Sequence, residues 1–193
     1  TFICVEGQHD IEFLMHMSAI LHKHDSTLPD LKKQNRVVFI SMGGTNLKNW
    51  VTYHYLEPLG LPEIHIYDRN SQKDYQQAHD EINNQGDGSW AAFTYGPEME
   101  NYLHLDAINE VFTGLNLQES DLKKNGYDIP CLIERRCSSI KNRTLRKEIQ
   151  KRGVKHFMNN EAVKKMTIKR LKKTDPQDTI IGWMRRIAEM IND

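Results

Sequence analysis

Short apolar runs that alternate with helix-like segments restrict the fold of this chain most strongly. Four runs read as strands, at 2–5, 37–40, 63–67 and 90–95. After the first run, apolar residues recur at helical spacing to about His24, and a polar segment at 72–84 separates the last two runs. Strands that alternate with helices are typical of a parallel sheet built from βαβ units. We therefore predict an α/β fold with a parallel, Rossmann-like sheet of about four strands flanked by helices.

The second half of the chain has a different pattern. A helix is predicted after residue 45 on the basis of Leu47, Trp50, Val51 and Leu56, but beyond residue 105 the strand signals fade. We predict helices at 107–112 and 161–166, one long basic helix or a pair of helices within 131–158, and a loop-rich segment at 114–126. Thr167 and Asp175 are expected helix caps. An apolar stripe predicts a final helix, and its members are Trp183, Met184, Ile187, Met190 and Ile191.

Charge is distributed unevenly, although the formal net charge is zero. Residues 1–122 hold 7 Lys/Arg and 18 Asp/Glu, a net charge of −11, and residues 123–193 hold 19 and 8, a net charge of +11. The stretch 135–173 has 15 Lys/Arg in 39 residues. An acidic half beside a basic half suits a metal site next to a surface that binds a polyanion such as nucleic acid. Two mutually attracted lobes, or ordinary solvated helix faces, are the alternative interpretation.

Composition indicates the cellular compartment of the protein more clearly than its reaction. The three cysteines form no C-x-x-C pair, and their odd number argues against a disulfide framework. The sequence has no signal peptide and no apolar run long enough to span a membrane, so we expect a cytoplasmic protein. Thr1 stands directly in strand-like sequence, which suggests a part of a longer protein. His16, His22 and His24 are expected at the surface, because the sequence lacks the H-x-x-x-H pair with a nearby carboxylate that would indicate a zinc site.

Acidic residues follow three of the four predicted strands. They are Glu6 and Asp10 after the first, Asp68 with the amide Asn70 after the third, and Glu98 and Glu100 after the fourth. Parallel order places these strand ends at one edge of the sheet, where open α/β sheets bind ligands. Clustered carboxylates repel one another unless a cation lies between them, and Mg²⁺ prefers oxygen ligands. Each acid alone is more simply explained as a helix cap, a turn residue or a partner of the helix dipole, so the prediction depends on their recurrence.

These residues resemble the paired signature of the Toprim fold. Val5-Glu6-Gly7 followed by Asp10, and a later strand that ends in Asp68-x-Asn70, carry the resemblance. The segment 97–103, Pro-Glu-Met-Glu-Asn-Tyr-Leu, is similar to the E-x-E-N-Y stretch of the overcoming-lysogenization-defect (OLD) branch of nucleases. The pairs Met158-Asn159, Met166-Thr167, Asp175-Pro176 and Gly182-Trp183 resemble the carboxyl-terminal helical part of that branch. The likeness covers nearly the whole chain.

The resemblance implies a metal-dependent endonuclease that nicks or cleaves DNA with two Mg²⁺ or Mn²⁺ ions. It implies that 1–105 is a Toprim catalytic core and that 106–193 is a basic helical subdomain. Glu6 would be a metal ligand and general base, and Lys155, with Lys151 as second choice, would stabilise charge on the phosphate. Lys151, Arg152 and Lys155 are expected to contact the nucleic-acid backbone. The remaining implied metal ligands are Asp10, Asp68, Asn70, Glu98 and Glu100.

Three further expectations come from the same resemblance. An ATPase domain would precede this region in the whole protein, oligomers would form through other domains, and the role would be defence against phage. Asn70 departs from the Asp-x-Asp pattern of the family and would bind one ion more weakly. Two alternatives therefore remain open, a Toprim nuclease that cleaves RNA such as tRNA, and a degenerate Toprim module that binds nucleic acid or a partner without catalysis.

Overall fold

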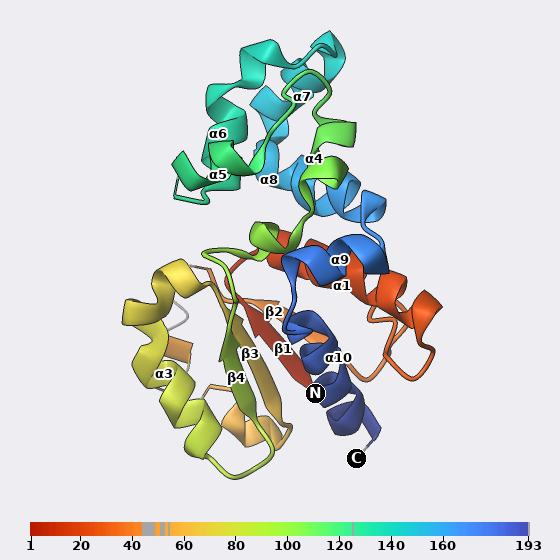
Figure 1. Ribbon diagram of the computed structural model, residues 1–193. Coiled ribbons are helices and arrows are strands. Elements are labelled where there is room, and N and C mark those ends of the chain that lie inside the picture. The colour runs from red at the N-terminus through yellow and green to blue at the C-terminus, as the bar shows by residue number, and fades with distance from the viewer. Residues whose placement is uncertain (44–48, 51–52, 54, 125, 193) are drawn as a thin grey trace.

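A four-stranded parallel sheet forms the centre of the protein (Figure 1). The computed structural model describes residues 1–43, 49–50, 53, 55–124 and 126–192. The strands are β1 (Phe2–Val5), β2 (Val38–Ser41), β3 (Glu63–Tyr67) and β4 (Trp90–Phe93). They lie in the order β2-β1-β3-β4, and each pairing is parallel. The predicted α/β sheet is confirmed.

The two central strands are covered on both faces. Every residue of β1 and β3 is buried, as is common for parallel strands covered on both faces. The buried polar residues of β3, Glu63 and His65, hydrogen-bond each other at 2.8 Å. Side chains alternate between the faces, so Ile3 and Val5 join one buried cluster while Phe2 and Cys4 join another. These strands therefore hold the residues that follow them in fixed positions.

Strand β2 is more exposed than the sequence suggested. A continuous apolar run such as 37–40 is typical of a strand covered on both faces, but Val38 is 52% exposed and Phe39 and Ile40 are only partly buried. The physical reason is that, among the described strands, β2 pairs only with β1 and lies at an edge of the sheet. Most of the helix predicted after it falls outside the described residues, although Leu56 is buried beside Phe2 and Cys4.

Helices cover the sheet in two layers. On one face lie α1 (Gln8–His24) and α10 (Thr179–Asn192), and α3 (Gln72–Asn84) lies on the other (Figure 1). The first layer buries Ile11, Phe13 and Leu14 of α1 in one cluster with Ile180 and Trp183 of α10. The second layer buries Tyr75, Ala78 and Ile82 of α3. The polar helix predicted at 72–84 is confirmed.

A further group of helices extends beyond the carboxyl edge of the sheet (Figure 1). It contains α4 (Leu105–Val111), α5 (Glu119–Lys124), α6 (Ile129–Arg135), α7 (Arg143–Arg152) and α8 (Val154–Phe157). The remaining helix, α9 (Ile168–Thr174), joins this group to α10. The short helical turns are η1 (Glu57–Leu59), η2 (Arg69–Ser71), η3 (Met99–Tyr102), η4 (Cys137–Ser139), the π-helical η5 (Met158–Ala162) and η6 (Val163–Lys165).

Two predictions for this group were wrong. The segment expected as loop contains α5, whose first turn is acidic and whose last turn is basic, an arrangement that favours a short helix. The stretch 131–158, predicted as one long basic helix or a pair of helices, contains parts of three helices, α6, α7 and α8. Asn142 caps α7 by accepting a hydrogen bond from the Leu145 N–H, and Gly153 ends it with a φ of +80°. A glycine adopts that conformation without the steric cost that other residues would meet.

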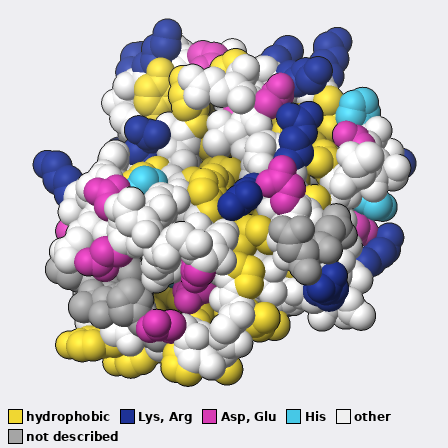
Figure 2. All heavy atoms as spheres, turned by 90° about the horizontal axis from the view of Figure 1, so that it is seen from below, with side chains coloured by type: hydrophobic (Ala, Val, Ile, Leu, Met, Phe, Trp, Pro, Cys, Tyr) yellow, Lys and Arg dark blue, Asp and Glu magenta, His cyan; other side chains and the backbone are white. Residues whose placement is uncertain are grey.

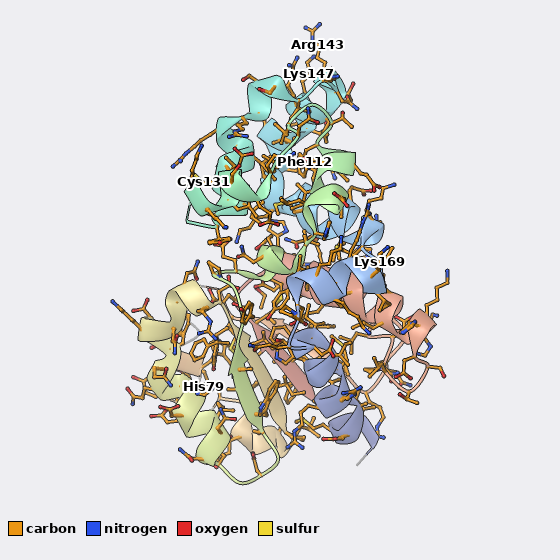
Figure 3. The ribbon with its side chains drawn as sticks, viewed as in Figure 1. His79, Phe112, Cys131, Arg143, Lys147 and Lys169 are labelled. Carbon is orange, nitrogen blue, oxygen red and sulfur yellow. The ribbon has the colours of Figure 1, made fainter. Side chains whose placement is uncertain are left out.

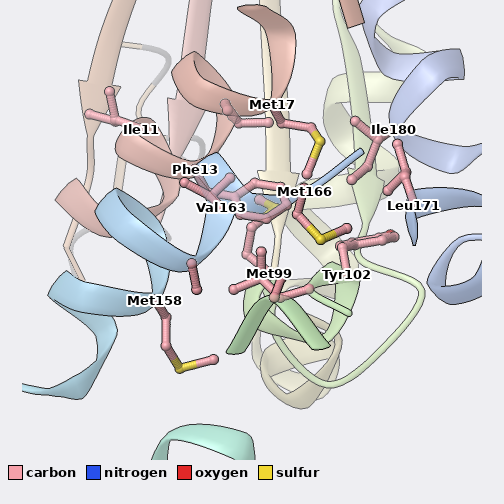
Figure 4. Packing of buried hydrophobic residues seen from close by; sticks show 14 of the residues in the cluster. Ile11, Phe13, Met17, Met99, Tyr102, Met158, Val163, Met166, Leu171 and Ile180 are labelled. Carbon is pink, nitrogen blue, oxygen red and sulfur yellow. The ribbon is translucent and has the colours of Figure 1, made fainter. Parts of the chain in front are cut away.

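One buried cluster links the sheet to both ends of the chain. Met17 of α1 and Met99 and Tyr102 of η3 pack with Met166 and Ile180 (Figure 4). Because α9 and α10 return to the sheet, the segment 106–193 contributes both to the sheet layer and to the outer helical group. The boundary at residue 105 stays a prediction. Among the described residues, no helix has the length and apolar character needed to cross a membrane.

Candidate metal centre

The carboxyl ends of β1 and β3 form a switch point of the sheet. The two strands are neighbours, and their other partners, β2 and β4, lie on opposite sides. In open α/β sheets such a point is the usual place for a ligand. Glu6 follows β1 directly and Asp68 follows β3, so the strand order places these two acids side by side.

Hydrogen bonds to the backbone hold the acids in place. Glu6 Oε1 accepts a hydrogen bond from the Asp68 N–H at 3.0 Å, which joins the two strand ends. Asp10, in the first turn of α1, accepts one from the Gly7 N–H at 2.8 Å. Asp68 Oδ1 accepts one from the Met99 N–H at 3.1 Å. The three carboxylates are therefore oriented by the backbone.

The segment after β4 closes over the same point. The Asn70 N–H donates to the carbonyl oxygen of Pro97 at 3.0 Å, and Asn70 Nδ2 donates to Glu98 Oε1 at 3.2 Å. The segment 97–103 contains the short η3, with Glu98 as the N-cap that precedes it and Glu100 in its first turn. The E-x-E segment thus lies against the Asp68–Asn70 turn.

Lys155 of α8 reaches the cluster from the outer helical group. Its Nζ lies 3.1 Å from Glu98 Oε2 and 3.6 Å from Glu100 Oε2. Burial disfavours the charge of Lys155, but the carboxylates of Glu100 and Glu98 outweigh that effect and raise its pKa. Lys155 is therefore a charged neighbour of the acids.

Glu100 and Asn159 are the most deeply buried residues of the cluster. Glu100 is 1% exposed, and its Oε1 accepts a hydrogen bond from Asn159 Nδ2 at 2.7 Å. The Oδ1 atom of Asn159 is buried and has no hydrogen-bond partner within the described part of the chain. A buried acceptor without a donor is costly in a folded protein, and a cation or an ordered water would satisfy it.

Burial changes the acidity of three of these groups. It raises the pKa of Asp68 to about 9, with repulsion from Asp10 and Glu6 as a second cause. It raises the pKa of Asp10 to about 7, with repulsion from Glu100 adding to it, and it also raises the pKa of Glu6. Ionising all of these acids together is unfavourable without a nearby cation. Their oxygen donors match the preference of Mg²⁺ or Mn²⁺, so the residues fit a divalent ion.

The structure brings most of the predicted site residues together. Contacts connect Glu6, Asp68, Asn70, Glu98, Glu100 and Lys155, and repulsion from Glu100 and Glu6 acts on the nearby Asp10. Lys151 and Arg152 lie at the exposed end of α7, where both pair with Glu148 at 3.2 and 3.4 Å. Those two residues are near Lys155 in sequence but are not part of the acidic cluster.

The basic side chains spread over the outer helices. Arg143 and Lys147 project at the end of α7 farthest from the sheet, and Lys169 lies on α9 (Figure 3). On the face that Figure 2 shows, Lys and Arg side chains lie mostly around the margin, with Asp and Glu side chains among them. Binding of a polyanion by this surface stays a prediction.

Sequence reasoning missed two features beside the cluster. No role at the site was predicted for Asn159, although its spacing of four residues from Lys155 suggests that the two side chains share a helix face. A group formed by His9, Glu12 and His156 was not foreseen either. The spacing of His9 and Glu12 on α1 was the available signal, but nothing in the sequence placed His156 next to them.

Comparison with known proteins supports the fold. No protein-family model matches the chain, and no curated protein sequence matches it. The solved structure of the C-terminal region of the OLD protein from Xanthomonas campestris pv. campestris matches with a TM-score of 0.53 and 16% identity. The match covers 99% of this chain and 95% of that one. The chain therefore has the fold of that region, a Toprim-like parallel sheet with carboxyl-terminal helices.

Proposed function

We propose that the protein is a divalent-metal-dependent endonuclease that hydrolyses phosphodiester bonds in DNA. The observation that carries the proposal is the meeting of Glu6, Asp68 and Glu98 with Lys155 at the switch point of the sheet. The fold shared with an OLD protein adds support. Acids that gather from three separate strand ends are difficult to explain as caps or turns alone.

Two groups of oxygens would hold the metal. Glu6 and Asp10 would bind on the β1 side, and Asp68, Asn70, Glu98 and Glu100 on the side of β3 and η3. Bound Mg²⁺ or Mn²⁺ would supply a nucleophilic water and neutralise the charge of the phosphate. Asn70 contributes a neutral oxygen, so ligation on the second side depends more strongly on the two glutamates.

Glu6 and Lys155 would have opposite roles towards the substrate. The Asp68 N–H fixes one oxygen of Glu6, and its carboxylate would receive the proton of the attacking water as general base. Lys155 would exchange its contact with Glu98 for a phosphate oxygen and stabilise the charge that builds there. Lys151 and Arg152, which are exposed on α7, would contact the backbone of the same nucleic acid.

The wider setting follows from the resemblance to OLD nucleases. We infer that the chain is the nuclease region of a longer protein with an ATPase domain, and that this protein acts in defence against phage. Asn70 favours one competing function, a module that binds nucleic acid without cleaving it. Metal-dependent cleavage separates the two.

Nicking of supercoiled plasmid tests the proposal. We expect nicking with Mg²⁺ or Mn²⁺, no nicking with EDTA, and a loss of at least about 100-fold in Glu6→Ala, because a ligand and base are removed. Asp80→Ala, which removes an exposed acid of α3, is the matched control and should retain full activity. Equal nicking by Glu6→Ala and the native chain would exclude this site. A tRNA substrate assayed in parallel distinguishes DNA cleavage from RNA cleavage.

A further inference from the structure

We propose that His9, Glu12 and His156 form a second metal site, separate from the carboxylate cluster, that binds a transition-metal ion such as Zn²⁺. One ligand atom of each residue lies within 4.8 Å of the other two. The proposal does not depend on nuclease activity. It concerns a site with two nitrogen donors and one oxygen donor, whereas the cluster at the sheet edge offers oxygen donors.

The geometry is close to what an ion needs. His9 Nδ1 lies 3.0 Å from Glu12 Oε2. The ring centroids of His9 and His156 are 6.3 Å apart, and the two ring planes make an angle of 61°. Ligand atoms on a tetrahedral Zn²⁺ are about 3.3 Å from one another, as bond lengths of about 2.0–2.1 Å require. Small side-chain movements would therefore bring all three donors within bonding distance.

The site is partly open to solvent. The side chains of His9 and Glu12 are 35% and 22% exposed, and His156 is partly buried. An ion has access, and water can complete its coordination. Two protein elements supply the ligands, since His9 and Glu12 belong to α1 and His156 belongs to α8.

Existing contacts leave His156 poorly satisfied. Asn160 Nδ2 lies 3.3 Å from its Nδ1, and Arg152 Nη1 lies 3.4 Å from its Nε2. Both neighbours are donors, but a neutral imidazole accepts a hydrogen bond at only one nitrogen. Asn160 Nδ2 also donates to Glu12 Oε2 at 2.5 Å and so orients the carboxylate. Both contacts of His156 are long for a hydrogen bond, so an ion could displace the donor at the unprotonated nitrogen, with the glutamate positioned beside it.

The donor set selects the class of ion. Imidazole nitrogens suit Zn²⁺, Co²⁺ and related ions, whereas Mg²⁺ prefers an octahedral set of oxygens. A second group of three candidate ligands, Cys4, Glu63 and His65, is buried in the sheet. Both nitrogens of His65 have close partners there, Glu63 at 2.8 Å and Tyr67 at 3.0 Å, whereas the contacts of His156 are longer, at 3.3 and 3.4 Å. That group is a hydrogen-bonded core network, and the group that includes His156 is the better metal site.

A bound ion would connect the two helices that carry Asp10 and Lys155. His9 precedes Asp10 in α1, and His156 follows Lys155 in α8. Joining His9 and Glu12 to His156 would fix α8 against α1 and hold Lys155 over the carboxylates. The site would thus position Lys155 without contacting a substrate.

Metal titration of the 193-residue chain tests this inference. With excess Mg²⁺ present, calorimetry should show one Zn²⁺ bound, and Co²⁺ should give the visible absorption of a site with nitrogen ligands. His9→Asn and His156→Asn should each weaken Zn²⁺ binding by at least about 10-fold. His24→Asn, at the exposed end of α1, should bind like the native chain. Retained binding in Glu6→Ala would support a separate site, and its loss there would overturn the proposal even if nicking occurs.

A measurement on the native chain covers the case in which a variant does not fold. Diethyl pyrocarbonate modifies accessible histidines, and mass spectrometry locates the modified positions. Zn²⁺ should protect His9 and His156 while His24 and His79 continue to react. Equal modification of His9 and His156 with and without Zn²⁺ would contradict the proposal.

Discussion

At the residue scale, the main feature is a group of three buried carboxylates at the carboxyl edge of the sheet. Asp10, Asp68 and Glu100 are each less than one-tenth exposed, and within the described part of the chain they lie near one another without enough positive charge to balance them. Lys155 supplies one cation for the whole group. A divalent ion would therefore stabilise this arrangement, and high pH would destabilise it in the absence of the ion.

The pH dependence of stability without metal follows from these acids. Below about pH 4 both folded and unfolded chains hold the protons, and above that pH the unfolded chain releases them first. Folding therefore becomes less favourable as pH rises to about 7 through Asp10 and to about 9 through Asp68. In EDTA, the free energy of unfolding should fall over this range. Asp68→Asn should gain at least about 1 kcal/mol over the native chain at high pH and little at low pH.

Urea unfolding at several pH values measures this difference. Asp80→Asn is the control because Asp80 is exposed, and hydrogen bonds from His79 and Gln76 lower its pKa. The difference between Asp68→Asn and the native chain should shrink when Mg²⁺ is added, since the ion favours the ionised acid. A difference that does not change with pH would exclude a raised pKa at Asp68.

Asn70 offers a second test at the residue scale. Its Nδ2 now donates to Glu98 Oε1, so Asn70→Asp replaces that donor with a second negative charge. Without metal the variant should be less stable, and with metal it should bind Mg²⁺ at least about 10-fold more tightly, because charge strengthens ligation. Calorimetric titration measures the affinity. Asn84→Asp, an exposed change on α3, should leave it unchanged, and equal affinities in both variants would remove Asn70 from the ligand set.

At the element scale, one irregular helical turn connects the outer helices to the site. The π-helical η5 follows α8 directly, and its wider turn places two consecutive asparagines on different partners. Asn159 contacts Glu100 of η3, while Asn160 contacts Glu12 of α1. In a regular α-helix, successive side chains point about 100° apart, so the residues after Asn159 would point in directions different from those in η5.

This turn also shows which elements the sequence predicted. The strands and the acids after them were predictable because a buried parallel strand is a local pattern and the chain order fixes where its end lies. The contact between Asn159 and Glu100 was not predictable, since it joins residues 59 positions apart through a rare turn. Helix α5 was missed because it has only six residues and one buried side chain, Leu122.

Lys155 tests the link between α8 and η3. Lys155→Met would leave Glu98 and Glu100 without their shared cation, so we expect a loss of about 1–3 kcal/mol in the free energy of unfolding without metal. Lys151→Met removes the same charge from a side chain that is 71% exposed and should change stability by less than about 0.5 kcal/mol. Urea unfolding compares the two variants. Equal losses would show that the contacts of Lys155 with the acids contribute nothing specific.

At the scale of the whole molecule, an acidic sheet layer meets a basic helical layer. The proposed metal centre lies where they join, because the acids come from the sheet edge and Lys155 comes from α8. A nucleic acid that reaches the acids would therefore pass along the basic helices, which balance its phosphates. The proposed path gives the uneven charge of the two halves a function, although the net charge is zero.

The two ends of α7 allow a matched test of that path. Lys151 and Arg152 lie at the end next to α8, and Arg143 and Lys147 project at the far end (Figure 3). Replacing either pair by glutamine removes two positive charges from the same helix. If DNA runs to the metal centre, Lys151→Gln with Arg152→Gln should weaken binding and lower the salt dependence of log Kd by about 1–2, as lost phosphate contacts require. The pair Arg143→Gln with Lys147→Gln should have a smaller effect, and fluorescence anisotropy at several salt concentrations measures both. Equal losses would indicate attraction by overall charge, and a larger loss at the far end would place the DNA away from the carboxylates.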